Sequence, residues 1–257
     1  LLMSHLCAYR LAATIGQGCL SPGAVKATYG TGAFVLAAMG DMPPRSGHRL
    51  LGTVLMQDKG QRRYALEGSV FVAGSLIKWL RDTMGLIGSA EETAALAASV
   101  PDSGGVVLVP ALSGLGAPHW RPDATAALTG MTFATTRAHV VRAALEAMAH
   151  QTRDLMAAFT ADRAPWASLR IDGGMSGNDW IAQDLADLLD LPVERPAMLE
   201  TTALGAAMLA ATASGWFASL DQAAGAMRGP LTRFEPRMKA SVRAQRIALW
   251  DDALAKV

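Results

Sequence analysis

The stretch from residue 168 to residue 190 constrains the fold more than any other part of this sequence. Residues 168–171 form an apolar run typical of a strand, and they lead directly into Gly173 and Gly174. Residues 179–190 then show a helical pattern. Glycine lets a ligand approach the backbone closely, and the free amides at a helix start carry partial positive charge. The unit therefore suits anion binding, although glycine pairs also occupy such turns for steric reasons alone.

The remaining pattern predicts strands first, and alternating strands and helices afterwards. Residues 23–29, 33–37 and 50–57 are expected to form an antiparallel meander, with a short strand over 64–67. Residues 106–109 are wholly apolar, as expected for a strand in a sheet that is covered on both faces. This order predicts an α/β fold with a mixed sheet and helices on both faces. The other expected elements are strands at 126–131 and 193–195 and helices at 69–84, 91–99, 137–161, 202–215 and 238–256.

The composition excludes several classes of protein. The 257 residues are 51% hydrophobic and 18% charged with a formal net charge of +1, so no nucleic acid or membrane partner is expected. The uncharged run 201–220 is rich in small residues, which favours a buried helix ending at Gly215 over a membrane span. Cys7 and Cys19 fit neither a zinc spacing nor a disulfide framework, which indicates a cytoplasmic protein. The composition is compatible with a homo-oligomer.

Three further glycine positions are candidate site residues. The Gly-Thr-Gly turn around Thr31 lies at a predicted hairpin tip, where amides and the hydroxyl could hold phosphate oxygens or simply form a turn. Gly74, inside the predicted helix 69–84, leaves room for a ligand or, more commonly, for another helix. Gly205, near the start of the helix 202–215, has the same two interpretations.

Other catalytic signals are weak or absent. Asp123 and Asp172 border glycine-rich loops and could assist a metal, although an isolated aspartate there more often caps the turn. The sequence contains no Walker A, HExxH or GxSxG motif, and its five histidines form no convincing Ser/His/Asp set.

Six ordered segments carry a resemblance that extends over nearly the whole chain from Ala12. They are residues 12–36, 64–87, 109–132, 144–156, 169–196 and 200–211, and they include ATYGTGAFVL, GLGAPHW and RIDGGMSGNDW. Together they resemble the C-terminal half of the FGGY carbohydrate kinases, and within that family they are most similar to the glycerol kinases. The resemblance implies an actin-like, ribonuclease-H-like domain over residues 12–257 that supplies most of a nucleotide site. Residues 1–11 match nothing in the family, and the family's first domain has no counterpart in this sequence.

The resemblance also implies roles for individual residues. ATP and Mg²⁺ are the implied cofactors, and glycerol or a related polyol is the implied partner. Lys78 is a departure, because many glycerol kinases have a glutamine there. The matching positions are Thr31 for phosphate, Gly74 and Lys78 in the nucleotide pocket, Gly174 and Asn178 around the adenosine, and Phe34 against the glycerol backbone.

The main departure from the family is Tyr9, which stands where the family has its general-base aspartate. Such a base takes the proton of the substrate hydroxyl as the phosphoryl group arrives. A tyrosine with its ordinary pKa of about 10 is a poor base at neutral pH. The register also places Ala8 and Arg10 at the family's Gly and Gln, so either a misassigned gene start or true divergence explains this segment.

No catalytic residue is therefore assigned in this chain. We expect the ATP-binding half of a kinase that phosphorylates glycerol to glycerol 3-phosphate, and we expect it to be inactive alone. The alternatives are a kinase for another polyol or sugar of the same family, and a non-catalytic nucleotide-binding module.

Overall fold

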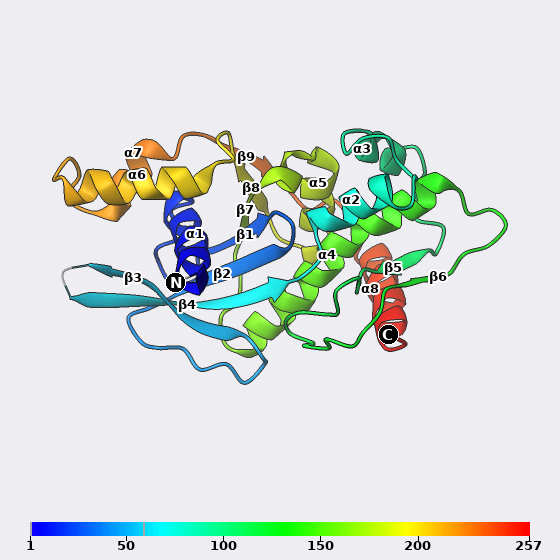
Figure 1. Ribbon diagram of the computed structural model, residues 1–257, viewed down its shortest axis with the longest axis horizontal. Helices are drawn as coiled ribbons and strands as arrows, with labels where there is room; N and C mark the ends of the chain where they lie inside the picture. The colour runs from blue at the N-terminus through cyan, green and yellow to red at the C-terminus, as the bar shows by residue number, and fades with distance from the viewer. Residues whose placement is uncertain (1, 59) are drawn as a thin grey trace.

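A seven-stranded mixed β-sheet forms the centre of the structure (Figure 1). The computed structural model describes residues 2–58 and 60–257. The strands of this sheet are β1 (Val25–Tyr29), β2 (Ala33–Gly40), β3 (Leu51–Asp58), β4 (Gln61–Val70), β7 (Leu169–Asp172), β8 (Val193–Pro196) and β9 (Leu231–Phe234). Their order is β3-β4-β2-β1-β7-β8-β9. The pairs from β3 to β1 are antiparallel, β1, β7 and β8 are parallel, and β9 is antiparallel to β8.

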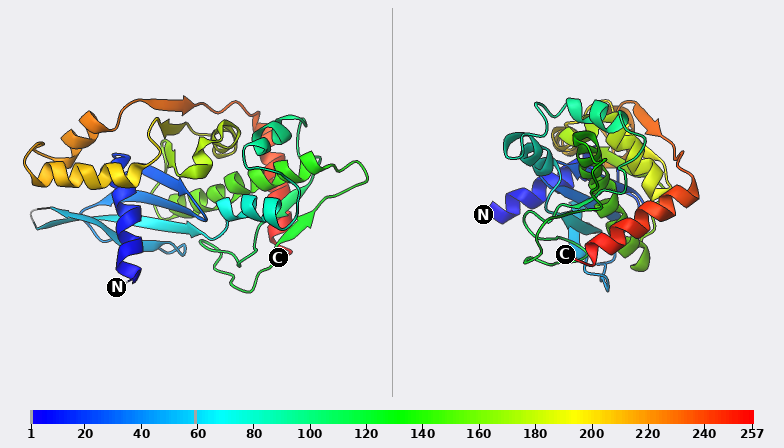
Figure 2. Two further views of the ribbon diagram at one scale, coloured as in Figure 1. Left: turned by 45° about the horizontal axis from the view of Figure 1, so that its top comes forward. Right: turned by 90° about the vertical axis from the view of Figure 1, so that its right-hand side faces the viewer.

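Helices cover both faces of this sheet, so the predicted fold class is confirmed (Figure 2). A separate small sheet pairs β5 (Val107–Val109) with β6 (Ala127–Thr129). A 3₁₀ turn, η1 (Gly174–Gly177), precedes α5. The helices are α1 (Leu2–Gly16), α2 (Gly74–Asp82), α3 (Glu92–Ala98), α4 (Arg137–Ala161), α5 (Asp179–Leu189), α6 (Thr201–Ala213), α7 (Leu220–Met227) and α8 (Ala240–Leu254).

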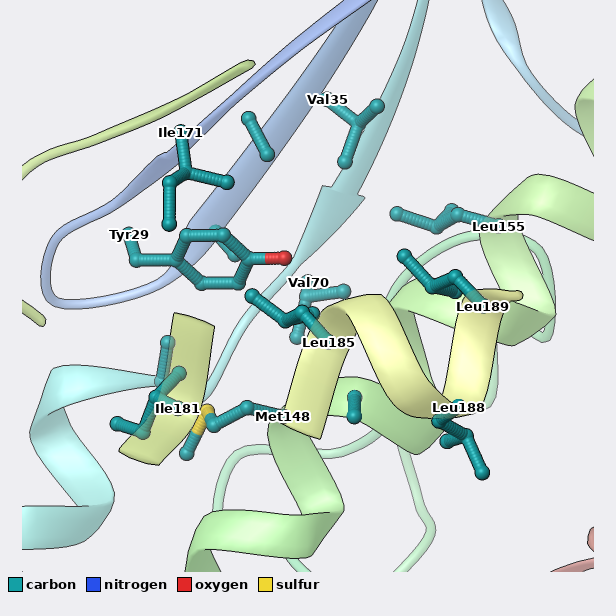
Figure 3. Packing of buried hydrophobic residues seen from close by; sticks show 14 of the residues in the cluster. Tyr29, Val35, Val70, Met148, Leu155, Ile171, Ile181, Leu185, Leu188 and Leu189 are labelled. Atoms are coloured by element: carbon teal, nitrogen blue, oxygen red, sulfur yellow. The ribbon is translucent and has the colours of Figure 1, made fainter. Parts of the chain in front are cut away.

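Alternation along β1 directs its side chains to opposite faces of the sheet. Ala27 and Tyr29 enter the main core, which α4 and α5 cover. Figure 3 shows Tyr29 close to Ile171 of β7, Met148 of α4 and Leu185 of α5. Burying an aromatic or aliphatic side chain of this size contributes roughly 2–3 kcal/mol, so this face provides much of the stability that holds the turn after Tyr29 in place.

The opposite face carries a buried polar network. Lys26 is completely buried, and its Nζ donates to Thr28 Oγ1 at 2.6 Å. Burial lowers the pKa of Lys26, and the charge of Asp172 opposes that shift. Asp172 is buried too, and its carboxylate accepts from Gln17 Nε2 at 3.0 Å and from Thr201 Oγ1 at 2.5 Å. These bonds tie the end of β7 to the residue that follows α1 and to the start of α6.

Helices α1 and α6 cross at two glycines. A Cβ on Gly205 would lie 1.8 Å from the carbonyl oxygen of Ala12, and one on Gly16 would lie 2.0 Å from the carbonyl oxygen of Thr201. Gly205 is therefore required for helix packing, the second of its two predicted interpretations. The boundary predicted between residues 11 and 12 falls inside α1.

The region around β4 differs most from the sequence prediction. We expected a strand over 64–67 and a helix over 69–84, whereas β4 continues to Val70 and α2 begins at Gly74. Ser69 and Val70 continue the ladder opposite Phe34 and Ala33 of β2. The second strand of the meander thus pairs with the fourth, and β3 lies at the edge of the sheet.

Two other expectations are corrected. The apolar strand 106–109 was expected in the main sheet, but β5 belongs to the small sheet and packs near Trp250 of α8. Within the uncharged run 201–220, the helix expected to end at Gly215 is α6, which ends at Ala213 just before Gly215 in the left-handed region, but α6 buries only one side. The elements α7 and β9 were not predicted. Within residues 2–58 and 60–257, no helix is long and apolar enough to cross a membrane.

Candidate functional site

The turn between β1 and β2 carries Thr31 and rests on the start of α2. The Ala73 amide donates to the carbonyl oxygen of Thr31 at 2.9 Å, and the Gly74 amide donates to that of Gly30 at 2.8 Å. Within residues 2–58 and 60–257, the amides of Thr31 and Gly32 donate to no backbone carbonyl, and Thr31 is exposed. Gly32 is buried and lines neither cavity, so the turn presents the free amide and the hydroxyl of Thr31, which suit phosphate oxygens.

Gly74 is the first residue of α2, not an interior helical residue as the sequence predicted. A Cβ at this position would lie 2.6 Å from the carbonyl oxygen of Gly30 and 3.5 Å from Met175 Cγ. Only glycine therefore allows α2 to contact the β1–β2 turn this closely.

The turn between β7 and α5 supplies the facing wall. Gly173 has φ +86°, and a Cβ there would lie 2.6 Å from the carbonyl oxygen of Tyr29, so β7 ends tightly against β1. Gly174 follows with no atom within 4 Å of its Cβ direction. It therefore presents bare backbone to open space.

Asn178 caps α5 with its side chain. Its Oδ1 accepts from the amides of Trp180 and Ile181 at 2.9 and 3.3 Å, and its Nδ2 donates to Thr93 Oγ1 of α3 at 3.2 Å. The amides that we predicted as an anion site are thus partly occupied by the cap. Asn178 instead holds α3 and α5 together beside η1.

All five residues predicted for the nucleotide site line two adjoining cavities. Thr31, Gly74, Lys78 and Gly174 line the smaller one, of about 290 Å³. Gly174 and Asn178 line the larger one, of about 510 Å³. The residues common to both cavities are Ile77, Ala90, Gly174 and Met175.

Sequence reasoning missed several lining residues of these cavities. Ile77 and Arg81 come from α2, and they follow Gly74 by three and seven positions. That spacing places them on one helical face and could have identified them. Glu91 and Thr93 line the larger cavity, and no pattern in the sequence pointed to them.

The structure places Phe34 outside the lining of both cavities and covers it with Arg10. The Arg10 guanidinium carbon lies 3.6 Å from the centre of the Phe34 ring. Arg10 Nη1 also forms an ion pair with Glu67, and Glu67 accepts from Ser69 Oγ at 3.2 Å. Tyr9, the neighbour of Arg10 on α1, is 63% exposed. The aromatic face that the resemblance assigned to a polyol is therefore occupied by a cation.

The two aspartates considered as metal ligands are not brought together. Asp172 is enclosed by its bonds to Gln17 and Thr201, and Asp123 lines a separate cavity beside the small sheet. Across the part of the chain that the structure describes, no group of three or more His, Cys, Asp or Glu residues could hold a metal ion. A third cavity, of about 730 Å³, lies at the β3–β4 edge beside Arg62 and Arg63, and none of the predicted site residues lines it.

The sheet order, the helices on both faces and the glycine turns at the ends of β1 and β7 define an α/β domain of the actin-like ATPase type. The chain belongs to the FGGY family of carbohydrate kinases, because the C-terminal domain of that family matches residues 25–214. The predicted family is thereby confirmed.

Several relatives are similar to nearly the whole chain. A glycerol kinase from Rhodospirillum centenum is 52% identical over 244 residues, which cover 95% of this chain and 49% of that protein. A glycerol kinase from Aromatoleum aromaticum is 52% identical over 246 residues, with coverage of 95% and 49%. The crystal structure of Plasmodium falciparum glycerol kinase with ADP superposes with a TM-score of 0.89 at 36% identity, covering 96% of this chain and 49% of that chain. The chain thus spans about half the length of the curated relatives that it matches.

Proposed function

We propose that this chain is the nucleotide-binding half of an ATP-dependent glycerol kinase. The observation that carries the proposal is that all five residues assigned by the resemblance line two adjoining cavities. The relatives named glycerol kinase, and the solved relative that contains ADP, support the same reaction. The parental reaction transfers the γ-phosphoryl group of ATP to a terminal hydroxyl of glycerol.

In this proposal the β1–β2 turn holds the phosphates. The hydroxyl and the free amide of Thr31 donate to phosphate oxygens, while the adenosine lies against Gly174 and η1. Phosphoryl transfer depends mainly on positioning and on charge neutralisation, so a rigid turn is an effective contribution. Gly74 supplies that rigidity, because α2 supports the turn through its backbone.

Mg²⁺ has no ligand set at Thr31 in this chain. The smaller cavity has no carboxylate among its described lining residues, whereas Mg²⁺ in proteins usually binds one or two carboxylates together with substrate phosphates. No step of the proposal therefore uses a metal ligand from these residues.

Calorimetric titration of the purified chain with ADP tests the nucleotide site. We expect binding that Thr31→Ala weakens and Gly174→Val abolishes, because valine would project into the open space beside Gly174. Gly225→Ala is the control, since that glycine also has no atom within 4 Å of its Cβ direction but lies in α7. If the unaltered chain binds no ADP, the proposal is wrong.

A coupled assay of ADP release with glycerol and ATP tests the claim of inactivity. We expect no turnover, because position 9 carries a tyrosine and the rest of the relatives' length lies outside this chain. Turnover at ordinary kinase rates of about 1–100 per second would contradict that claim.

A non-catalytic nucleotide-binding module is the second candidate, and the contact of Arg10 with Phe34 favours it. A cation stacked on this ring, and paired with Glu67, competes with a polyol for the same surface. Under this hypothesis, adding the first half of a glycerol kinase relative in trans would leave the chain inactive even in a Tyr9→Asp, Arg10→Gln double variant, which restores the family's aspartate and glutamine. Recovery of turnover in that mixture would favour the kinase instead.

A further inference from the structure

The two adjoining cavities carry charges of opposite sign. Among the described residues, Lys78 and Arg81 are the charged side chains that line the smaller cavity. Glu91 and Asp179 are those that line the larger one. Asp179 is paired with Arg195 at 2.7 Å, so Glu91 supplies the negative charge at the Asn178 end, and a bound anion is favoured at the Thr31 end.

Lys78 is the cation of this pair that is free to bind an anion. Arg81 already makes two bonds to Asp82, with its Nε at 2.6 Å and its Nη2 at 3.0 Å from the carboxylate oxygens. Lys78 has no ion-pair partner among residues 2–58 and 60–257, and its side chain is exposed. It follows Gly74 by one helical turn, so it lies on the face of α2 that lines the cavity.

Backbone amides at the start of α2 do not substitute for Lys78. The amides of Ala73 and Ser75 both donate to the Thr31 carbonyl oxygen, and that of Gly74 donates to the Gly30 carbonyl oxygen. The amides of Trp180 and Ile181 at the start of α5 are used by the Asn178 cap. These amides are therefore unavailable to phosphate oxygens, and Lys78 is the side chain that can add a contact to those of the Thr31 turn.

We propose that Lys78 makes this site select nucleotides by their phosphate charge. The Nζ of Lys78 forms a charge-assisted contact with the phosphate chain of an adenine nucleotide whose terminal phosphates lie at Thr31. The contact strengthens binding of ADP and ATP, contributes little for AMP, and contributes nothing for adenosine. This inference depends on the proposed function, because it assumes that an adenine nucleotide occupies the two cavities.

Calorimetric titration of the chain with adenosine, AMP, ADP and ATP at 50 and 300 mM NaCl tests the proposal. We expect Lys78→Gln to weaken ADP and ATP about five- to twenty-fold at 50 mM NaCl, the range of one partly exposed charge-assisted contact. Adenosine binding should change less than about twofold, because the contact is absent. The difference for ADP should shrink at 300 mM, because salt screens exposed charges.

Two further variants separate charge from structure. Lys78→Arg keeps the charge and should retain ADP binding within about threefold of the unaltered chain. Lys256→Gln removes the same charge from an exposed pair with Asp252 on α8, outside both cavities, and should change nothing.

The outcomes distinguish this inference from the proposed function. Unchanged ADP binding by Lys78→Gln, or equal weakening of adenosine and ADP, overturns the inference and leaves the nucleotide site intact. Failure of the unaltered chain to bind any of the four ligands overturns the proposed function and the inference with it.

Discussion

Gly74→Ala is the substitution for which the structure gives the sharpest expectation. The new methyl group would lie 2.6 Å from the carbonyl oxygen of Gly30. A carbon–oxygen contact needs about 3.3 Å or more, so the β1–β2 turn and α2 must separate by roughly 0.7 Å. Overpacking of this kind costs about 1–3 kcal/mol, and the better helix propensity of alanine returns up to about 1 kcal/mol. We expect a net loss of about 1–2 kcal/mol in the free energy of unfolding.

The displaced turn should also weaken nucleotide binding. The amide of Gly74 donates to the carbonyl oxygen of Gly30 at 2.8 Å, so a shift of α2 moves the neighbouring Thr31 away from the phosphates. We expect ADP affinity to fall at least tenfold, since misplacement of a contact by about 1 Å can have effects of this order or larger. Urea unfolding measures the stability, and calorimetry measures the affinity.

Gly225→Ala is the matched control for Gly74→Ala. Gly225 is also helical, but no atom lies within 4 Å of its Cβ direction. Alanine there should stabilise the chain by about 0.5–1 kcal/mol and leave ADP binding unchanged. The reasoning is refuted if Gly74→Ala stabilises the chain as much as Gly225→Ala and binds ADP normally.

Three other changes have defined outcomes. Gly205→Ala should destabilise the chain by about 3 kcal/mol or more in urea unfolding, because its methyl group would overlap the Ala12 carbonyl oxygen of α1; wild-type stability would contradict the close helix crossing. Asn178→Ala should lose about 1 kcal/mol in the same assay because α5 loses its cap, and Asn178→Asp, which keeps the acceptor, should recover most of it. Burial would raise the pKa of Asp162, but hydrogen bonds from Ser46, His48 and the Gly47 amide lower it below its usual value. A carboxylate with a lowered folded pKa stabilises the protein above the unfolded pKa of about 3.9, and this contribution disappears as the pH falls through the folded value. Asp162→Asn should therefore flatten the acid limb of the free energy of unfolding below about pH 4, and an unchanged limb would show that other carboxylates dominate it.

Much of the fold could be predicted because the relevant signals are local. The helix over 137–161 was placed with its observed bounds, since a long apolar stripe of helical period needs no knowledge of its partners. The strands on either side of Thr31, and the strand before Gly173, were recognised as short strand-like runs next to glycine turns. Those glycine turns are also the parts of the candidate site that sequence reasoning identified.

The failures concern information that the local pattern does not contain. Residues 69–73 fit the helical period by chance, but Ser69 and Val70 belong to β4 because they pair with Phe34 and Ala33 of β2. The apolar strand 106–109 has the same pattern whether the surrounding sheet is large or small, so its position depends on contacts with α4 and α8. Arg10 lies over the Phe34 ring because of the way α1 crosses the sheet. No spacing of residues along the chain predicts that crossing.

A crystal structure of this chain with ADP would test the central claim most directly. We predict the diphosphate within hydrogen-bond distance of the amide and hydroxyl of Thr31, with the adenosine against Gly174 and beside Asn178. ADP bound elsewhere, for example in the third cavity beside Arg62 and Arg63, would contradict the account.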